Sequence, residues 1–264
     1  MKLTTCRRLQ LLSAVVLSLA LLPVLAKEDE AARLEAISRV VESHDPKLSV
    51  QIGRVYVKQA ALRSARELLA ERGGAAGLGR RWTLEHPEWQ RAEQELLQGV
   101  DDLVGRRVND PVWVKEAWSQ LMSQILNGEE ADEIAVHFQS EGGTYQRRVI
   151  EWFVGELTLQ TYTFTDRLRY GVSGSEQEMR DLQAATYERA MLDRVYDFTE
   201  YPDAMRFASR DPGAKYFRIM MIQGVHALHL HPEAVADAAR QMIRSRAVLA
   251  DPHIARARES RKPG

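Results

Sequence analysis

The sequence has almost no cysteine. Cys6 is the only one, and it stands before the first apolar run, whereas the lipid-bearing cysteine of a lipoprotein stands after that run. The rest of the chain therefore has neither disulfides nor thiolate metal ligands, and it depends on a hydrophobic core for its stability. With 264 residues, 45% of them hydrophobic, it can bury a large core.

The sequence also lacks a large excess of either charge. It has 36 basic and 37 acidic residues and no basic stretch, which argues against nucleic acid as the main partner. Beyond the N-terminal region, no apolar run approaches the roughly 20 residues that span a bilayer. We therefore expect no nucleic-acid partner and no transmembrane segment in the mature chain.

Known catalytic motifs are missing as well. The glycine-rich stretch 73–79 follows no predicted strand and is not closed by Gly-Lys-Ser/Thr, so it is interpreted as a linker rather than a phosphate-binding loop. The stretch 171–175 lacks the final glycine of a nucleophile elbow, and no strand leads into it. These patterns predict no cofactor and no particular reaction.

The N-terminus has the features of a secretory signal. Basic residues, among them Arg7 and Arg8, precede an apolar run at 11–22, and a Val-Leu-Ala segment ends at Ala26. We predict cleavage after Ala26, since the run is shorter than a membrane anchor requires. The mature chain would begin at Lys27 and, without the three basic residues of the signal, would be mildly acidic. We expect it to be exported to the periplasm.

Hydrophobic residues recur at helical spacing through the mature chain. The sequence therefore predicts an all-α fold, a multi-helix bundle of antiparallel helix hairpins with an internal duplication. Its parts are a signal peptide (1–26), an N-terminal helical region (27–108), a C-terminal helical domain with two similar corners (109–250) and a polar tail (251–264).

Several helix ends are marked by particular residues. Pro87 and Pro111 suit the first position of a helix, where the missing N–H costs nothing. Ser175, followed three positions later by Glu178, fits a capping box that opens another helix. Asn127 and the glycine after it are interpreted as a helix stop.

The secondary structure of two further segments has more than one interpretation. The stretch 161–165 alternates and is β-rich, but an apolar stripe of helical period runs through it, so it is predicted to be helical. One helix is expected to end at His229 and the next to begin at Pro232, because proline is unfavourable inside a helix.

The chain is organised around a predicted helix–corner–helix unit at Ser140-Glu141-Gly142-Gly143. A similar pattern recurs later: Phe138 is matched by Phe207 and Ser140 by Ser209, and both pairs have the same separation in sequence. We expect the phenylalanine to face the core, the serine to cap the turn, and the glycine to adopt backbone angles that other residues avoid.

The first corner resembles a bacterial exported family known as domain of unknown function 2059. The match consists of Glu130, the pair His137-Phe138, Ser140 and Gly143. Glu141 departs from the family pattern, which has proline there, and His137 replaces an aromatic residue. The resemblance implies an exported helical protein and supplies no catalytic residues.

His226, His229 and His231 form the candidate metal site. The first two lie one helical turn apart, and Glu233 or Asp237 could complete a tetrahedral set. The alternative is that these histidines interact with the carbonyl groups at a helix end and face water.

Other side chains could also have a role. Glu133 and His137 are four positions apart, as in an oriented general base, although an exposed surface pair has the same spacing. Trp113 and Trp118 point to different sides of one helix, which makes one of them a candidate surface anchor, although burial in the core is the default for large aromatic side chains. Methionines such as Met220 could line a channel for an apolar ligand or simply fill the core.

The function expected from these patterns is binding. We expect a non-enzymatic periplasmic helical protein that binds an envelope protein or associates with itself. The alternative is a metal-dependent hydrolase that uses His226, His229 and His231.

Overall fold

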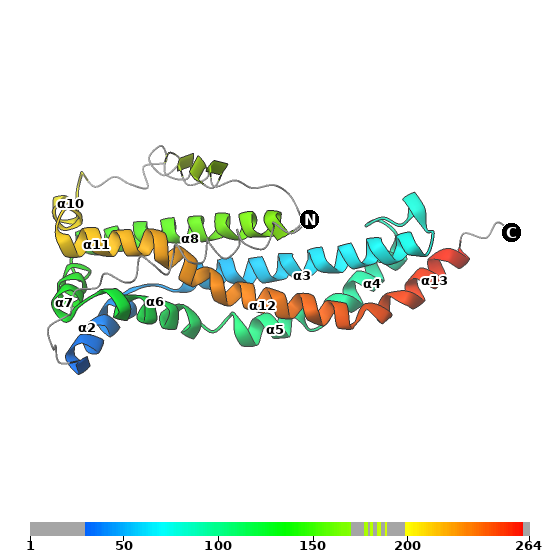
Figure 1. Cartoon of the computed structure of the whole chain (residues 1–264), viewed down its shortest axis with the longest axis horizontal. Coiled ribbons are helices and arrows are strands. Elements are labelled where there is room, and N and C mark those ends of the chain that lie inside the picture. The colour runs from blue at the N-terminus through cyan, green and yellow to red at the C-terminus, as the bar shows by residue number, and fades with distance from the viewer. Residues whose placement is uncertain are drawn as a thin grey trace, which may run out of the picture.

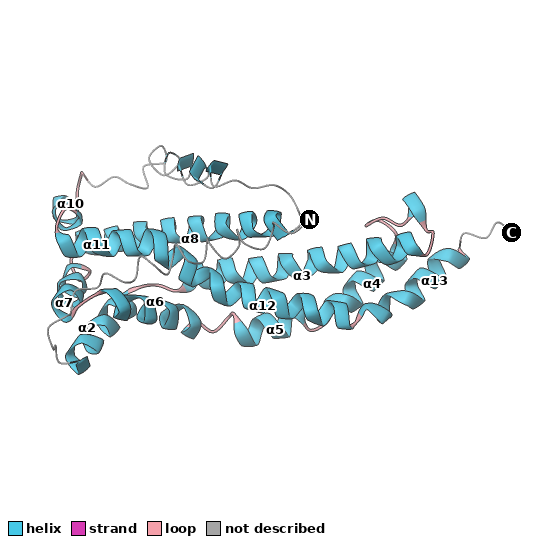
Figure 2. Cartoon of the chain, in the orientation of Figure 1, coloured by secondary structure: helices cyan, strands magenta, loops and turns pink. Residues whose placement is uncertain are grey.

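The structure, a computed structural model, describes residues 30–169 and 199–260 and a few isolated residues between 177 and 188. The regular structure of these residues is helical throughout, without a strand (Figure 2). The all-α prediction is therefore confirmed. The predicted signal peptide and most of the helix expected from Ser175 lie outside the described residues.

The described helices form an elongated bundle (Figure 1). Its three long helices pack against one another and run in the same direction: α3 (Lys47–Ala75), α8 (Glu141–Arg169) and α12 (Val225–Ser245). Three shorter helices lead back in the opposite direction: α4 (Pro87–Leu97), α5 (Val100–Arg107) and α6 (Val112–Ile125). α4 and α5 pack on α3, and α5 and α6 pack on α12.

Short helices cover both ends of the bundle. One end carries α2 (Glu30–Ser43), α7 (Gly128–His137), α10 (Pro202–Ala208) and α11 (Asp211–Ile219). The opposite end carries the single turns η1 (Gly79–Arg81) and η3 (Ala247–Ala250) and the helix α13 (Asp251–Glu259). α13 packs against α4 and buries His253, Ile254 and Ala257, so this part of the segment predicted to be a polar tail is a docked helix.

One main core joins the predicted N-terminal and C-terminal regions. The expected boundary at residue 108 falls between α5 and α6, yet buried side chains from both regions belong to the same apolar cluster. Each long helix owes its stability to this packing more than to intrinsic propensity. Within the described ranges, no helix combines the length and apolarity needed to cross a membrane.

The largest difference from the sequence prediction concerns Pro232. It does not begin a helix but lies inside α12, which continues α11 through a π-helical turn, η2 (Met220–Gly224). A proline inside a helix cannot donate to the carbonyl four positions earlier, here that of Leu228, and its ring crowds that turn. The Tyr162 hydroxyl of α8 donates to the Leu228 carbonyl instead, at 3.1 Å.

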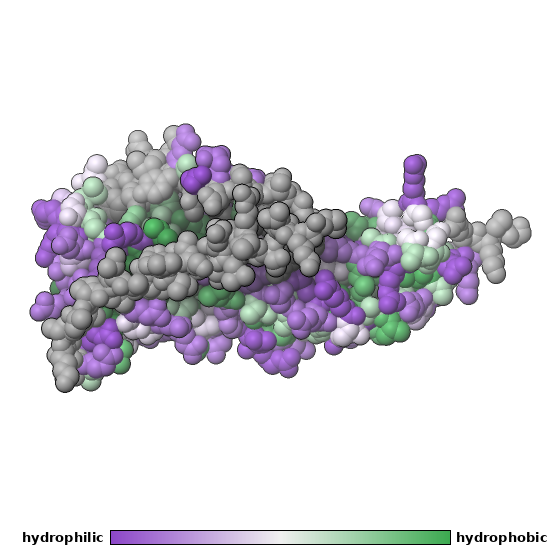
Figure 3. Space-filling model, in the orientation of Figure 1, coloured by the Kyte–Doolittle hydropathy of each residue, from purple (hydrophilic) through white to green (hydrophobic). Residues whose placement is uncertain are grey.

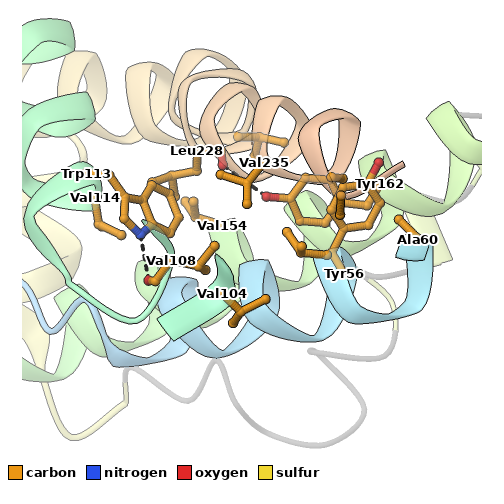
Figure 4. Close-up of a cluster of buried hydrophobic side chains, with 14 of the residues drawn as sticks. Tyr56, Ala60, Val104, Val108, Trp113, Val114, Val154, Tyr162, Leu228 and Val235 are labelled. Atoms are coloured by element: carbon orange, nitrogen blue, oxygen red, sulfur yellow. Dashed lines mark hydrogen bonds between the residues drawn. The ribbon is translucent and has the colours of Figure 1, made fainter. Parts of the chain in front are cut away.

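The neighbouring helices are shaped to accept this proline. Gly53 of α3 leaves room for its ring, since a Cβ at residue 53 would lie 2.9 Å from the Pro232 Cγ. Tyr162 is itself held by Tyr56 of α3, whose ring stacks on it at a centroid distance of 4.0 Å. Figure 4 shows this buried cluster, where Tyr162 points at Leu228 and the Trp113 indole donates to the Val108 carbonyl at 2.9 Å.

The β-rich stretch 161–165 is helical, as predicted. Its helix contains threonines at 158, 161 and 163, and each hydroxyl donates to the carbonyl four positions earlier, at 2.6–3.1 Å. These local bonds satisfy the hydroxyls of residues that otherwise favour extended structure. Tyr162, between them, is turned to the core and fully buried.

The helix stop predicted at Asn127 is confirmed, since α6 ends at Ile125, and the next helix begins at once. Asn127 is the N-cap of α7: its side-chain oxygen accepts from the Glu130 backbone N–H at 2.8 Å. The Glu130 carboxylate accepts from the Asn127 N–H at 3.0 Å, which completes a capping box. Glu130 also pairs with Lys215 at 2.6 Å and so ties α7 to α11.

Replacing Tyr162 with phenylalanine tests the role of its hydroxyl. We expect Tyr162→Phe to lower the free energy of unfolding by about 1–3 kcal/mol, because the buried Leu228 carbonyl loses its donor. Tyr201→Phe is the matched control, since the Tyr201 hydroxyl has no hydrogen bond to any residue that the structure describes. Urea unfolding followed by circular dichroism measures both changes.

A second substitution separates the contribution of this hydrogen bond to stability from that of the packing of the tyrosine ring. In a Pro232→Ala background residue 232 regains an N–H that can donate to Leu228, so Tyr162→Phe should cost less there than in the wild-type chain. An equal cost in both backgrounds would show that the tyrosine does not act through this carbonyl.

Candidate functional site

The histidines of the predicted metal site lie along one continuous helix in different surroundings. His226 is exposed. His229 is buried and packs on Tyr162 at a ring distance of 4.9 Å. His231 stacks on Trp113 at 5.0 Å and contacts the Arg107 carbonyl.

The carboxylates that could have completed this site have other partners. Glu233 accepts from the Tyr56 hydroxyl and from the Arg240 guanidinium, and Asp237 pairs with Arg240 at 2.9 Å. In the part of the chain that the structure describes, no three His, Cys, Asp or Glu side chains converge closely enough to hold a metal ion. Met220, the predicted ligand-lining residue, is fully buried in the core.

The tryptophans and His137 have roles in the core and between helices. Trp113 and Trp118 are both buried, so the core position that was the default is confirmed and neither is a surface anchor. His137 does not form the expected surface pair with Glu133: it contacts the Gln146 side chain at 2.8 Å and stacks on Phe207, while Glu133 pairs with Arg210 at 2.5 Å. Burial lowers the pKa of His137, outweighing the bond to Gln146.

The two helix corners have the same backbone arrangement. In the first, residues 137–143, the Ser140 N–H donates to the His137 carbonyl at 3.0 Å; in the second, residues 207–213, the Arg210 N–H donates to the Phe207 carbonyl at 3.0 Å. Phe207 therefore corresponds to His137 and not to Phe138, so the predicted pairing of the corners is wrong by a single position. Ser140 caps α8 through the Gly143 N–H, as expected.

The corner glycines are required for a different reason from the one predicted. Neither Gly143 nor Gly213 has a positive φ angle. Instead, a Cβ on Gly143 would lie 1.9 Å from the His137 carbonyl oxygen, and a Cβ on Gly213 would lie 2.1 Å from that of Phe207. Both glycines therefore allow one helix to start directly against the end of the previous one.

The two corners also contact each other, and the contacts match in pairs. Ser140 of the first corner donates to Asp203 at 3.2 Å, and its counterpart Arg210 pairs with Glu133, the counterpart of Asp203. His137 stacks on its own counterpart, Phe207, at 3.8 Å and an interplanar angle of 13°. The contacts between the two corners are therefore reciprocal.

A shallow pocket of about 380 Å³ lies between the two corners. We call it the corner pocket; it is lined by Glu133, Val136, His137, Asp203, Arg206, Phe207 and Arg210. Three of these residues from α7 have their counterparts from α10 in the same pocket. The pocket therefore has an apolar and aromatic floor and a rim with two carboxylates and two guanidinium groups.

A buried polar network joins the helices at the end of the bundle that carries the two corners. The His44 ring, after α2, bonds through Nδ1 to Glu151 of α8 at 2.9 Å and through Nε2 to the Tyr216 hydroxyl of α11. Burial raises the pKa of Tyr216, so the phenol keeps its proton and donates to the imidazole. The carboxylate–imidazole–phenol order resembles a catalytic relay, but the His44 side chain is inaccessible and its partners are structural.

A second titratable cluster fixes the opposite end. Glu88 of α4 accepts from Arg256 at 2.8 Å and contacts His253 at 2.9 Å, both on α13. These bonds, the one from Arg256 first, lower the pKa of Glu88 from its ordinary value of 4.5 to about 2. The cluster therefore docks α13 against α4, and its three side chains are engaged with one another.

No family model, no curated protein and no solved structure matches the chain. The resemblance of the first corner to domain of unknown function 2059 stays a prediction.

The lowered pKa of Glu88 predicts how stability changes with acid. A carboxyl whose pKa is lower in the folded state contributes stability above its unfolded pKa and loses it as the pH falls toward the folded value. The wild-type chain should therefore lose stability between about pH 5 and pH 2 more steeply than Glu88→Gln. The midpoint of urea unfolding as a function of pH measures this difference.

The control for Glu88 is Glu71→Gln. Glu71 is exposed and forms no ion pair among the described residues, so its replacement should leave the acid limb of the wild-type profile unchanged. Equal profiles for Glu88→Gln and the wild type would contradict the role given to Glu88.

Proposed function

We propose that the chain is exported to the periplasm and acts by binding another protein chain, an envelope partner or a second copy of itself, through the end of the bundle that carries the corner pocket. The observation that carries the proposal is the exposure of large apolar side chains at this end, one of them, Val136, in the lining of the pocket. Val136 of α7 is 67% exposed and Met205 of α10 is 52% exposed. Exposed apolar groups rimmed by charges are typical of protein interaction sites.

The surroundings of these side chains support the same function. Around the α7 and α10 end, Figure 3 shows hydrophilic side chains next to pale and hydrophobic ones. The corner helices are held by the capping box of α7, by the ion pair of Glu130 with Lys215, and by the network of His44 beneath them. A surface that is already ordered loses less entropy on binding.

The hydrolase alternative receives no comparable support. His229 is buried, His226 and His231 lie in different surroundings, and Glu233 and Asp237 are engaged by Arg240. Binding is therefore the function that these residues favour.

Export can be tested through the predicted cleavage site. Expressed in a Gram-negative bacterium, the full chain should be recovered from the periplasm with Lys27 as its N-terminal residue. Ala26→Arg should block processing and leave the longer chain, because signal peptidase requires a small residue there. Intact-mass measurement of fractionated cells distinguishes the two forms, and an unprocessed wild-type chain would contradict export.

Binding can be tested by site-specific photo-crosslinking in the cell. A photoreactive amino acid at residue 136 or 205 should give discrete adducts, whereas the same group at Val112, which is 49% exposed at the start of α6, should give few. Denaturing gels and mass spectrometry identify the adducts. Equal yields at all three positions would argue against the corner end as the binding surface.

A further inference from the structure

The charged side chains around the corner pocket differ in whether they form ion pairs. Glu133 and Arg210 pair with each other across the two corners, at 2.5 Å. Arg206 is exposed and forms no ion pair within the described part of the chain, and Asp203 accepts from the Ser140 hydroxyl at 3.2 Å. Among the described residues, the same surface therefore presents one cation and one anion that have no opposite charge bound to them.

This pattern disfavours a partner of a single charge sign. An acidic partner would be attracted by Arg206 and repelled by Asp203, and a basic partner would meet the reverse. A surface with one charge of each sign is instead complementary to itself in a twofold contact, because each charge meets its opposite and the same ion pair forms twice. Val136, the exposed apolar side chain of the pocket lining, would be buried in the same contact.

We propose that the surface around the corner pocket binds the same surface of a second copy of the chain, so that the two copies form an isologous dimer. Val136 of each copy enters the corner pocket of the other, over the apolar floor that includes Phe207. Arg206 of each copy pairs with the partner's Asp203. The inference rests on the proposed binding function and names its partner.

Charge reversal gives the sharpest test. Arg206→Asp leaves two acidic groups on the surface, and Asp203→Lys leaves two basic groups. Each variant should dimerise at least about tenfold more weakly than the wild type, a difference of about 1.4 kcal/mol. An equimolar mixture of the two should recover dimers, since both reciprocal pairs are then attractive. Sedimentation velocity of the purified mature chain over a concentration series measures the association.

Two further variants guard against effects on folding. Val136→Glu changes a side chain that is 67% exposed, so it should weaken the dimer and leave the thermal unfolding of the monomer unchanged. Val112→Glu, on α6, is its matched control, and Arg106→Asp, an exposed arginine of α5, is the control for the charge change. Both controls should dimerise like the wild type.

The outcomes separate this inference from the proposed function. A wild-type chain that stays monomeric at about 100 µM, or a dimer unaffected by Val136→Glu and both charge reversals, overturns the inference. Discrete adducts from residue 136 to another protein in cells, with a monomeric purified chain, also overturn it but keep the binding function. A dimer that responds as expected supports the inference even if the chain proves not to be exported.

Discussion

The bundle depends on the continuity of the helix that runs from α11 through η2 and α12. It contacts α3, α8, α5 and α6 along its length, and it connects the two ends of the molecule. A proline in its interior would cost about 3 kcal/mol if nothing compensated for the missing hydrogen bond. The hydroxyl of Tyr162 on α8 supplies that bond, and Gly53 on α3 makes room for the proline ring. The contacts around Pro232 therefore fix the three long helices relative to one another.

The sequence predicts the fold class because helical periodicity is a property of each segment by itself. Pro87 begins α4 as expected, and the apolar stripe through residues 161–165 correctly outweighs their β propensity. The prediction at Pro232 is wrong because the donor that compensates for the proline, Tyr162, belongs to a different helix. The stop predicted at Asn127 is correct, and the bond between its side chain and the Glu130 N–H shows that the same residue also caps the next helix.

The candidate site is less accessible to sequence reasoning. The similarity of the two corners is visible in the sequence, where Phe207 aligns with Phe138. The backbone hydrogen bonds show instead that Phe207 corresponds to His137. Asp203 and Arg206 are central to the proposed interaction, but no spacing singles them out, because their significance lies in which charges have no opposite charge bound to them among the described residues. The histidines near 226 attract attention by proximity in sequence, which says little about what each imidazole contacts.

The polar clusters of this protein are of two kinds, one buried inside the bundle and one exposed to solvent. The network of His44, Glu151 and Tyr216 has the chemical order of a catalytic relay, but its imidazole is enclosed by Trp118 and Phe138, and each of its members is engaged. Buried and satisfied groups of this kind set the orientation of the helices that they join. The corner pocket is the opposite case, since its rim charges and apolar side chains remain in contact with solvent. The buried network therefore holds α2, α8 and α11 in place, and the exposed corner pocket is the surface that we propose to recognise another chain.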